Sequence, residues 1–512
     1  MALATVANGR AQPLSGAALW GAGILLALAN FVAVLDLSIA NVSVPNISGA
    51  LGASTSQGVW IITSYAVAEA ITVPLTGWLA ARFGPVRTFA TALIGFGIAS
   101  ALCGLAPSLG LLVFFRVLQG ICGGPLMALS QTLLMQIFPP DKRPAAMGLW
   151  AVTTLVAPVC GPILGGYLCD TFGWGSIFLV NVPVAILAGV MVWRTLSRYE
   201  GLTRRAPFDG VGLALLVVWI GALQILLDLG KERDWFQSPL IVALGLVALV
   251  GFAAFMIWEL TEKNPIVNLK VFRHRGFSTS MITMSLVMGA FFATNVLTPL
   301  WLQSNMGYTA TWAGYVTGMI GILAIFSAPI TAQVMARVDP RRILFIGVSW
   351  LAFTTFMRSH GESQMTFGQI SLWLFVAGAA MPMFFLPVTT VALGAVDPEE
   401  TADASGLLNF IRTMSGAVAT SIVNTVWENN ATSNHADLVA AMPNAQATVD
   451  SLTPSMGAAQ ALGAVNNLVG SQAVMLATNQ LFLACAGVFA LAAALVWLTP
   501  RPAREVDTSA AH

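Results

Sequence analysis

Long apolar stretches follow one another along almost the whole chain and are separated by short polar connections. About twenty apolar residues in a helix cross the hydrocarbon core of a membrane. On that measure the sequence predicts an all-α polytopic membrane protein with fourteen transmembrane helices. The predicted ranges are 17–41, 57–80, 88–106, 109–136, 145–168, 175–195, 210–229, 238–259, 278–303, 310–336, 342–359, 366–396, 403–427 and 478–499.

One connection is long, from about residue 428 to residue 479, between the last two predicted helices. It is rich in Ala, Asn, Ser and Gln, and the stretches HADLVAAM and AAQALGAV have partial helical periodicity. The sequence therefore predicts a partly helical excursion outside the membrane. Two interpretations are open, namely an element that docks a partner and a solvated cap over the mouth of a cavity.

Composition supports a membrane protein. Of the 512 residues 57% are hydrophobic and 9% are charged, and mean hydropathy is +0.80, whereas soluble domains have about 25% charged residues. A formal net charge of +1 gives no indication of a nucleic-acid partner. The first apolar run, from about residue 17 past residue 40, is too long for the core of a signal peptide and predicts a retained first helix.

The positive charges predict the orientation. Cytoplasmic connections of membrane proteins are enriched in Lys and Arg. With both termini cytoplasmic, eighteen Lys and Arg residues fall on the cytoplasmic side and three on the opposite side. Two further arginines, Arg116 and Arg412, lie within predicted helices.

An internal repeat predicts two related halves. A proline and two arginines keep the same spacing in PLTGWLAARFGPVR, which starts at Pro74, and in PITAQVMARVDPRR, which starts at Pro329. Both copies follow an even-numbered predicted helix, and repeated halves around a central site are common in secondary transporters. The predicted organisation is a tail at 1–16, a six-helix bundle at 17–195, two inserted helices and their flanking connections at 196–276, a second six-helix bundle at 277–500 and a tail at 501–512.

Two carboxylates lie inside predicted helices, Asp36 in the first and Glu69 in the second. A charged side chain in the hydrocarbon core costs several kcal/mol, so such residues are usually functional. A carboxylate there can alternate between neutral and charged forms as access switches sides, which suits proton coupling. For Asp36 the alternative is a helix-end acid satisfied by Ser38 or Asn41, and Glu69 is also a candidate to contact cationic groups of a substrate.

Arg116, in FFRVLQGICGGP, is expected to hold a carboxylate or a carbonyl, because a guanidinium stays charged when it is buried. Participation in a proton relay and a purely structural role are both open for it. Arg412, with Asn409 one turn before it, is the corresponding polar feature of the second half.

The fifth predicted helix contains APVCGPILGG. Its two prolines, Pro158 and Pro162, remove backbone donors and favour a bend. The small residues Gly161 and Gly165, with Gly166 beside them, favour close packing against a neighbouring helix.

Other chemistry has no support in the sequence. The phosphate-binding pattern G-x-x-x-x-G-K-[ST] is absent from the sequence, and the four histidines lack metal-ligand spacing. No paired spacing links the five cysteines, and we expect them to be buried and inert. We therefore expect neither an enzyme nor a metal or cofactor site, and we expect an ion gradient to supply the energy.

Several stretches together resemble the major facilitator superfamily, in particular the fourteen-span drug:proton antiporter branch with its EmrB/QacA-type exporters. The resemblance covers about residues 17–500 and rests on the following segments: VLDLSIANVSVP, WIITSYAVAEAI, GWLAARFGPVR, FFRVLQGICGGPL, APVCGPILGGYL, WGSIFLVNVP, LDLGKERDWFQS, GYTATWAG and NFIRTMSGAVATSI.

The resemblance implies roles for these segments. GWLAARFGPVR is similar to a gating loop, which would include Gly77, Arg82, Gly84 and Arg87, although Ala81 stands where the family often has an acid. APVCGPILGG is similar to the antiporter motif and FFRVLQG to a motif linked to proton transfer. Asp36 matches the acid in the first helix of this branch.

The family also implies a function and partners. We expect proton-coupled efflux of hydrophobic or amphipathic drugs across a bacterial inner membrane, with a periplasmic adaptor and an outer-membrane channel as partners. A dedicated exporter of one metabolite, fatty acid or siderophore is the alternative among transporters. A non-transporting membrane sensor or scaffold is the alternative of a different class.

Overall fold

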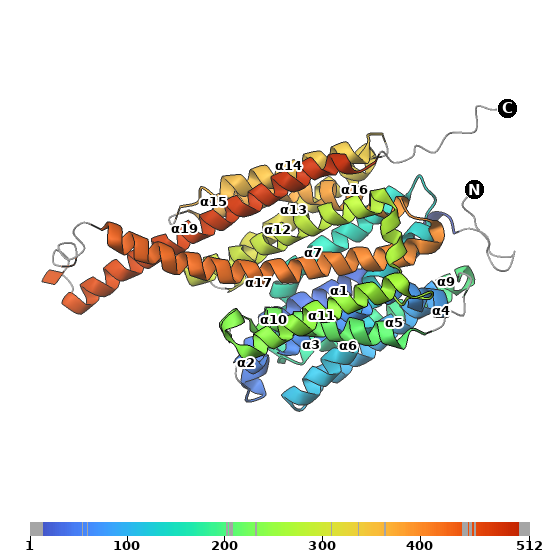
Figure 1. Ribbon diagram of the computed structural model, residues 1–512, viewed down its shortest axis with the longest axis horizontal. Helices are drawn as coiled ribbons and strands as arrows, with labels where there is room; N and C mark the ends of the chain where they lie inside the picture. Colours follow the sequence, from blue (N-terminus) through green and yellow to red (C-terminus); the bar gives the residue numbers. More distant parts are fainter. Residues whose placement is uncertain are drawn as a thin grey trace.

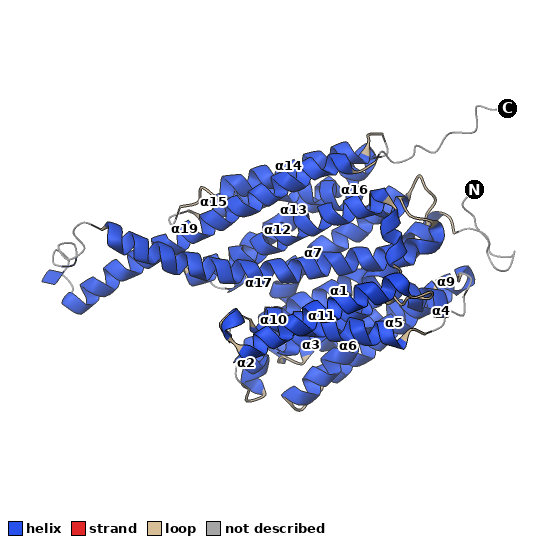
Figure 2. Cartoon of the chain, viewed as in Figure 1, coloured by secondary structure: helices blue, strands red, loops and turns tan. Residues whose placement is uncertain are grey.

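The computed structural model describes residues 14–500 except for 54, 59, 201–202, 204–207, 231–232, 309, 336, 363–364, 443–448, 450–452 and 455–456. The predicted tails, apart from residues 14–16, lie outside the described residues. Within the described part of the chain every regular element is a helix and no strand occurs, as Figure 2 shows. The predicted all-α class is therefore confirmed.

The first half of the chain forms a bundle of long helices, together with short helical pieces at their ends (Figure 1). Its helices are α1 (Gly16–Ala50), α2 (Thr55–Gly58), α3 (Trp60–Thr72), α4 (Thr76–Phe83), α5 (Pro85–Gly104), α6 (Leu109–Ile137), α7 (Arg143–Phe172), α8 (Ser176–Leu179) and α9 (Asn181–Leu196).

Two helices follow and pack against each other, α10 (Gly210–Leu229) and α11 (Pro239–Thr261), and α10 also contacts the first bundle at α3. The second bundle comprises α12 (Arg275–Ser304), α13 (Ala310–Met335), α14 (Pro340–Arg358), α15 (Phe367–Gly378), α16 (Ala380–Gly394), α17 (Thr401–Ala441) and α19 (Ala458–Leu495).

All fourteen predicted segments coincide with helices, but they differ in how apolar they are. Among the described residues, ten helical segments are long and apolar enough to cross a membrane. The predicted second, fifth, eleventh and thirteenth spans do not meet that measure. The second is divided into α3 and α4, and the eleventh and thirteenth are α14 and α17, which carry arginines. In the fifth, α7, several side chains lie outside the described residues, and the part that is counted, Ala145–Thr154, is a shorter apolar helix.

Proline marks where several helices break or begin. Pro74 lies in the turn between α3 and α4, where it has no N–H to continue the helix. Pro85 and Pro340 stand at the first positions of α5 and α14, where a missing N–H costs nothing. Since these two prolines occupy equivalent places in the sequence repeat, the structure identifies α14 as the second-half counterpart of α5.

The predicted connection at 428–479 is mostly a continuation of the two helices that flank it. α17 runs on to Ala441 and α19 begins at Ala458, and Figure 1 shows both projecting beyond the other helices. The indole of Trp427 donates to the hydroxyl of Thr478 at 2.9 Å, which ties the two helices together. The partly helical character was predicted correctly, whereas the helix ends at 427 and 478 were wrong.

The two bundles touch where α6 ends and α17 begins. The hydroxyls of Thr132 and Ser405 lie 3.0 Å apart, and the amide of Asn409 donates to the Gln131 side chain at 2.8 Å. This contact lies at the end of the bundle where α1 starts and α19 finishes (Figure 1). The halves are therefore closed against each other at that end.

Gly77 of α4 lies in this closed contact. A Cβ built at Gly77 would lie 1.5 Å from Oδ1 of Asp403 and 2.9 Å from its Cα. We expect Gly77→Ala to force α4 and α17 apart and to lower the free energy of unfolding by about 1–3 kcal/mol, as overpacking does. Thermal unfolding in detergent measures the loss, and spin labels on α4 and α17 measure the separation.

Gly394→Ala is the matched control, because a Cβ at Gly394 would meet no atom within 4 Å. Equal unfolding temperatures and equal spin-label distances in the two variants would contradict the close contact between Gly77 of α4 and Asp403 of α17.

Candidate functional site

Asp36 and Arg116 form an ion pair inside the first bundle. Nη1 of Arg116, on α6, donates to Oδ2 of Asp36, on α1, at 2.6 Å, and the side chains are 0% and 1% exposed. The expectation that Arg116 holds a carboxylate or a carbonyl is confirmed for both groups, because its Nε also donates to the carbonyl of Ile61 at 2.9 Å.

Neutral side chains complete the network. The amides of Gln119 and Asn181 donate to Oδ1 of Asp36 at 2.9 and 2.8 Å, and the hydroxyl of Ser100 accepts from both amides at 3.0 and 3.4 Å. Helices α1, α3, α5, α6 and α9 therefore all contribute to one buried site. Two buried charges and their hydrogen-bonding partners stabilise one another in a low dielectric.

This geometry tests the interpretation of Asp36 as a helix-end acid. The hydroxyl of Ser38 donates to the carbonyl of Val34 at 3.1 Å and is not a partner of the carboxylate. The side chain of Asn41 lies outside the described part of the structure. Arg116 and two amides supply the hydrogen bonds of the Asp36 carboxylate, so the interpretation in which Ser38 satisfies Asp36 is wrong.

Sequence reasoning missed Asn181, Ser100 and Tyr65 as members of the site. The ring of Tyr65 lies under the guanidinium of Arg116, with 4.3 Å between Cζ and the ring centroid. A polar Asn in the apolar run FLVNVPVAIL was the available signal for Asn181.

Glycines bring α6 close to α3. Cβ atoms built at Gly120 and Gly123 would lie 2.5 Å from the Tyr65 carbonyl oxygen and 2.4 Å from the Tyr65 hydroxyl. These glycines therefore allow α6 to approach α3 closely, and this approach positions the Tyr65 ring against Arg116.

Glu69 and Arg412 link this site to the second half. Glu69 of α3 is 4% exposed, and the charges of Arg412 and Arg116 both attract it. Arg412 of α17 is 6% exposed, its Nη2 lies 2.7 Å from Sδ of Met127, and its Nη1 has no hydrogen-bond partner among the described residues. A cation of one half therefore acts electrostatically on an acid of the other half.

The loop between α4 and α5 is held by an acid from elsewhere in the chain. Gly84 has φ of +92°, a conformation that favours glycine, and a Cβ there would lie 2.2 Å from Oε1 of Glu200. The Glu200 carboxylate accepts from the backbone N–H groups of Val86 and Arg87 at 2.9 and 3.0 Å. Glu200 thus caps the start of α5, near the position where Ala81 replaces the acid of the family.

The motif on α7 packs closely on α1 at two of its glycines. A Cβ at Gly161 would lie 2.3 Å from Cβ of Ser38, and one at Gly165 would lie 3.3 Å from Cγ2 of Ile39. A Cβ at Gly166 would meet no atom within 4 Å. The side chains of Pro158 and Pro162 lie outside the described residues, and α7 continues through both positions.

His274, Asp397 and Glu400 are the one group within the described ranges whose atoms are spaced like metal ligands. The Arg273 guanidinium already bridges both acids, at 2.9 Å to Asp397 and 3.1 Å to Glu400. The acids therefore have a cationic partner within the chain.

Comparison with known proteins agrees with this architecture. Residues 26–420 match the Major Facilitator Superfamily. The chain is 44% identical over 497 residues to the Multidrug export protein EmrB of Escherichia coli K12, covering 96% of this chain and 97% of that protein. It is 43% identical over 495 residues to the Fatty acid resistance protein FarB of Neisseria gonorrhoeae, covering 96% and 98%.

The fold also resembles solved structures. The proton:xylose symporter XylE aligns with a TM-score of 0.58 at 14% identity, over 94% of this chain and 96% of that one. The helical bundles and the buried polar network are those of a multi-pass membrane transporter. The chain belongs to the major facilitator superfamily, as its sequence motifs indicated, and within it resembles the EmrB/QacA-type exporters.

Asn181 tests the network independently of Asp36 and Arg116. We expect Asn181→Ala to lower the free energy of unfolding by about 1–3 kcal/mol, because it removes a buried donor from a carboxylate. Thermal unfolding of the purified protein measures this loss. The exposed Gln460→Ala is the control, and an equal unfolding temperature for both variants would contradict the role of Asn181.

Proposed function

We propose that the protein exports hydrophobic or amphipathic drugs in exchange for protons, by alternating access between its two six-helix halves. The buried Asp36–Arg116 network beside Glu69 carries this proposal, because proton coupling needs titratable groups within the membrane. The likeness to the Multidrug export protein EmrB over nearly the full length supports drug export. A proton gradient supplies the energy, and no cofactor takes part.

The two acids have different surroundings and hence different proposed roles. Asp36 receives hydrogen bonds from one guanidinium and two amides, which hold its charge in place. The charges of two arginines that belong to different halves both act on Glu69. We assign proton exchange in this conformation to Glu69, and to Asp36 and Arg116 an ion pair that opens when the halves move.

The orientation of the protein in the membrane follows from the distribution of Lys and Arg, because eighteen of these residues fall on the side that is assigned to the cytoplasm. Both termini are then cytoplasmic, in the inner membrane of a bacterium. The closed contact between α6 and α17 lies on the cytoplasmic side. The structure then corresponds to a conformation closed to the cytoplasm, with Gly77, Arg82, Gly84 and Arg87 at the inner gate.

Partners follow from the same assignment. A periplasmic adaptor and an outer-membrane channel would receive the exported compound. The projecting ends of α17 and α19 lie on the periplasmic side in this orientation and are available for contact with the adaptor.

A narrower export function is the second candidate. The Fatty acid resistance protein FarB is nearly as similar to the chain as the Multidrug export protein EmrB. A dedicated exporter of one acid would carry a single compound, whereas a multidrug exporter would carry chemically unrelated ones. Efflux profiling with a broad panel separates the two.

Asp36→Asn tests proton coupling. We expect the variant to fold and to lose substrate efflux driven by a pH gradient in proteoliposomes, because the neutral amide cannot form the ion pair with Arg116. Dye efflux and internal pH are measured together. Asp437→Asn, an exposed acid of the projecting helix, is the control and should transport as the unmodified protein does.

Full coupled efflux by Asp36→Asn would overturn the assignment. Transport by the unmodified protein without any dependence on the pH gradient would point to a uniporter. The absence of transport with every compound tested would favour a sensor or scaffold.

Glu69→Gln tests the assignment of proton exchange. Substrate binding to the unmodified protein in weakly buffered detergent solution should release protons, and the variant should bind without release, because an amide has no proton to exchange in this range. A pH indicator dye measures the release. The exposed Glu362→Gln is the control, and equal release from the Glu69 variant would assign the proton to another group.

A further inference from the structure

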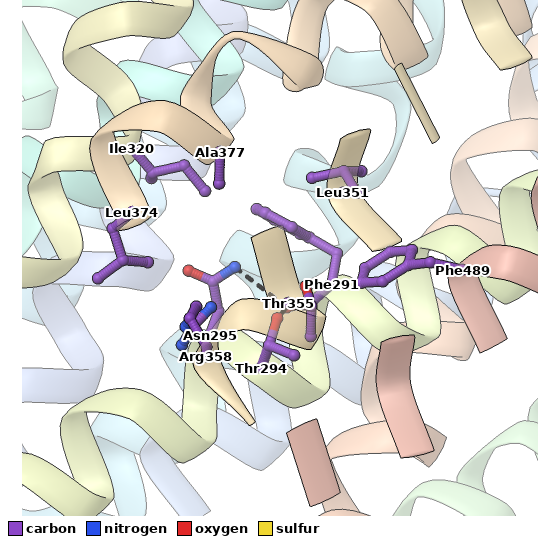
Figure 3. Close-up of a pocket in the computed structure, with 10 residues that line it drawn as sticks. All are labelled: Phe291, Thr294, Asn295, Ile320, Leu351, Thr355, Arg358, Leu374, Ala377 and Phe489. Carbon is purple, nitrogen blue, oxygen red and sulfur yellow. Dashed lines mark hydrogen bonds between the residues drawn. The ribbon is translucent and has the colours of Figure 1, made fainter. Parts of the chain in front are cut away.

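A small cavity lies inside the second bundle, away from the network around Asp36. Its volume is about 10 Å³, the space of one water-sized group. Figure 3 shows Arg358 and Asn295 on one side of it, with Phe291 and Phe489 on another. The other lining residues are Thr294, Ile320, Leu351, Thr355, Leu374 and Ala377.

Arg358 is a cation without an acidic partner among the described residues. Its guanidinium donates to the hydroxyl of Thr298 and lies 4.2 Å from the ring centroid of Phe482. Within the described ranges no carboxylate lies at ion-pair distance from it, whereas Arg116 and Arg341 both have an acidic partner. Arg358, near the end of the predicted helix 342–359, is one of the three positive charges assigned by sequence to the non-cytoplasmic side, and its side chain lines the cavity inside the second bundle.

The sequence repeat relates this cavity to the ion-pair site of the first half. The spacing that pairs Pro85 with Pro340 also pairs Ser100 with Thr355 and places Arg358 opposite Cys103. Ser100 belongs to the network around Asp36, and Thr355 lines the cavity. At this level of the first half Asp36 and Arg116 form an ion pair. At the equivalent level of the second half, Arg358 is present without an acid among the lining residues.

A partly buried cation beside a mainly apolar cavity lacks the counter-charge that would offset its loss of hydration. A guanidinium matches the planar, forked shape of a carboxylate, with which it forms two parallel hydrogen bonds. Thr294, Thr355 and Asn295 add neutral polar groups, and the cavity contains no acid that would repel an anion.

We propose that the cavity beside Arg358 binds a carboxylate group. The group belongs either to a small free acid or to the headgroup of an amphipathic substrate, and the second case rests on the export function proposed above. In this conformation the cavity has room for about one water-sized group, so a bound carboxylate, which has three heavy atoms, requires the lining side chains to move apart.

The test uses the full-length protein in lipid nanodiscs and measures the binding of three probes by calorimetry, with empty nanodiscs subtracted. Acetate represents a free acid, decanoate represents an amphipathic carboxylate, and decanol has the same chain without the charge. We expect Arg358→Gln to weaken the binding of the carboxylate probes by about tenfold or more, which corresponds to about 1.4 kcal/mol, and to leave decanol unchanged.

Two further variants separate charge from folding. Arg358→Lys keeps the charge and should retain part of the affinity. Ala377→Leu adds apolar bulk to the cavity lining while Arg358 keeps its charge, and it should block binding even if Arg358→Gln does not fold. Lys263→Gln, which removes an exposed positive charge elsewhere, is the matched control and should bind as the unmodified protein does.

The outcomes are distinct. If Arg358→Gln weakens the binding of decanoate but not that of acetate, the site binds a substrate headgroup. If the variant weakens the binding of acetate alone, the site binds a small free acid. Carboxylate binding that is unchanged in both Arg358→Gln and Ala377→Leu overturns the proposal. Proton-driven dye efflux by the unmodified protein tests the export function separately, so a failure there leaves the result for the anion site intact.

Discussion

The buried ion pair between Asp36 and Arg116 is the interaction on which the first bundle depends. Two charges inside the membrane are tolerable only as partners, and removal of one member of such a pair costs about 3–5 kcal/mol. Five helices supply groups to this pair or to its neighbours, so the network ties α1, α3, α5, α6 and α9 into one body. A half that moves as a unit is what alternating access requires.

The two halves share a repeat but differ in how they balance charge. The first half neutralises Arg116 internally, whereas Arg358 and Arg412 of the second half have no acid at ion-pair distance within the described residues. The charge of Arg412 acts on the acid Glu69 of the first half, and Arg358 lines a cavity. This asymmetry is the basis of two proposals, proton exchange in the first half and at the contact between the halves, and an anion site in the second half.

Individual residues show how far prediction from sequence reached. Asp36 and Arg116 were identified because a charge in an apolar helix is conspicuous, and the kind of partner expected for Arg116 was correct. The amide of Asn181 and the carboxylate of Glu200 were missed, since a single polar residue near a helix end has many ordinary explanations. Residues 428–479 were predicted to be only partly helical, and the unbroken continuation of α17 and α19 was not predicted, because these stretches lack the apolar run that marks a membrane span.

The sequence by itself determined the succession of helices, the membrane setting and the two related halves. These are local properties, because each apolar segment must satisfy its own backbone hydrogen bonds within the membrane. Only the tertiary structure decided which distant groups meet. Asp36 and Arg116 are 80 positions apart, and Glu200 lies more than a hundred positions from the helix start that it caps. Such contacts depend on the faces through which the helices pack, which no single segment specifies.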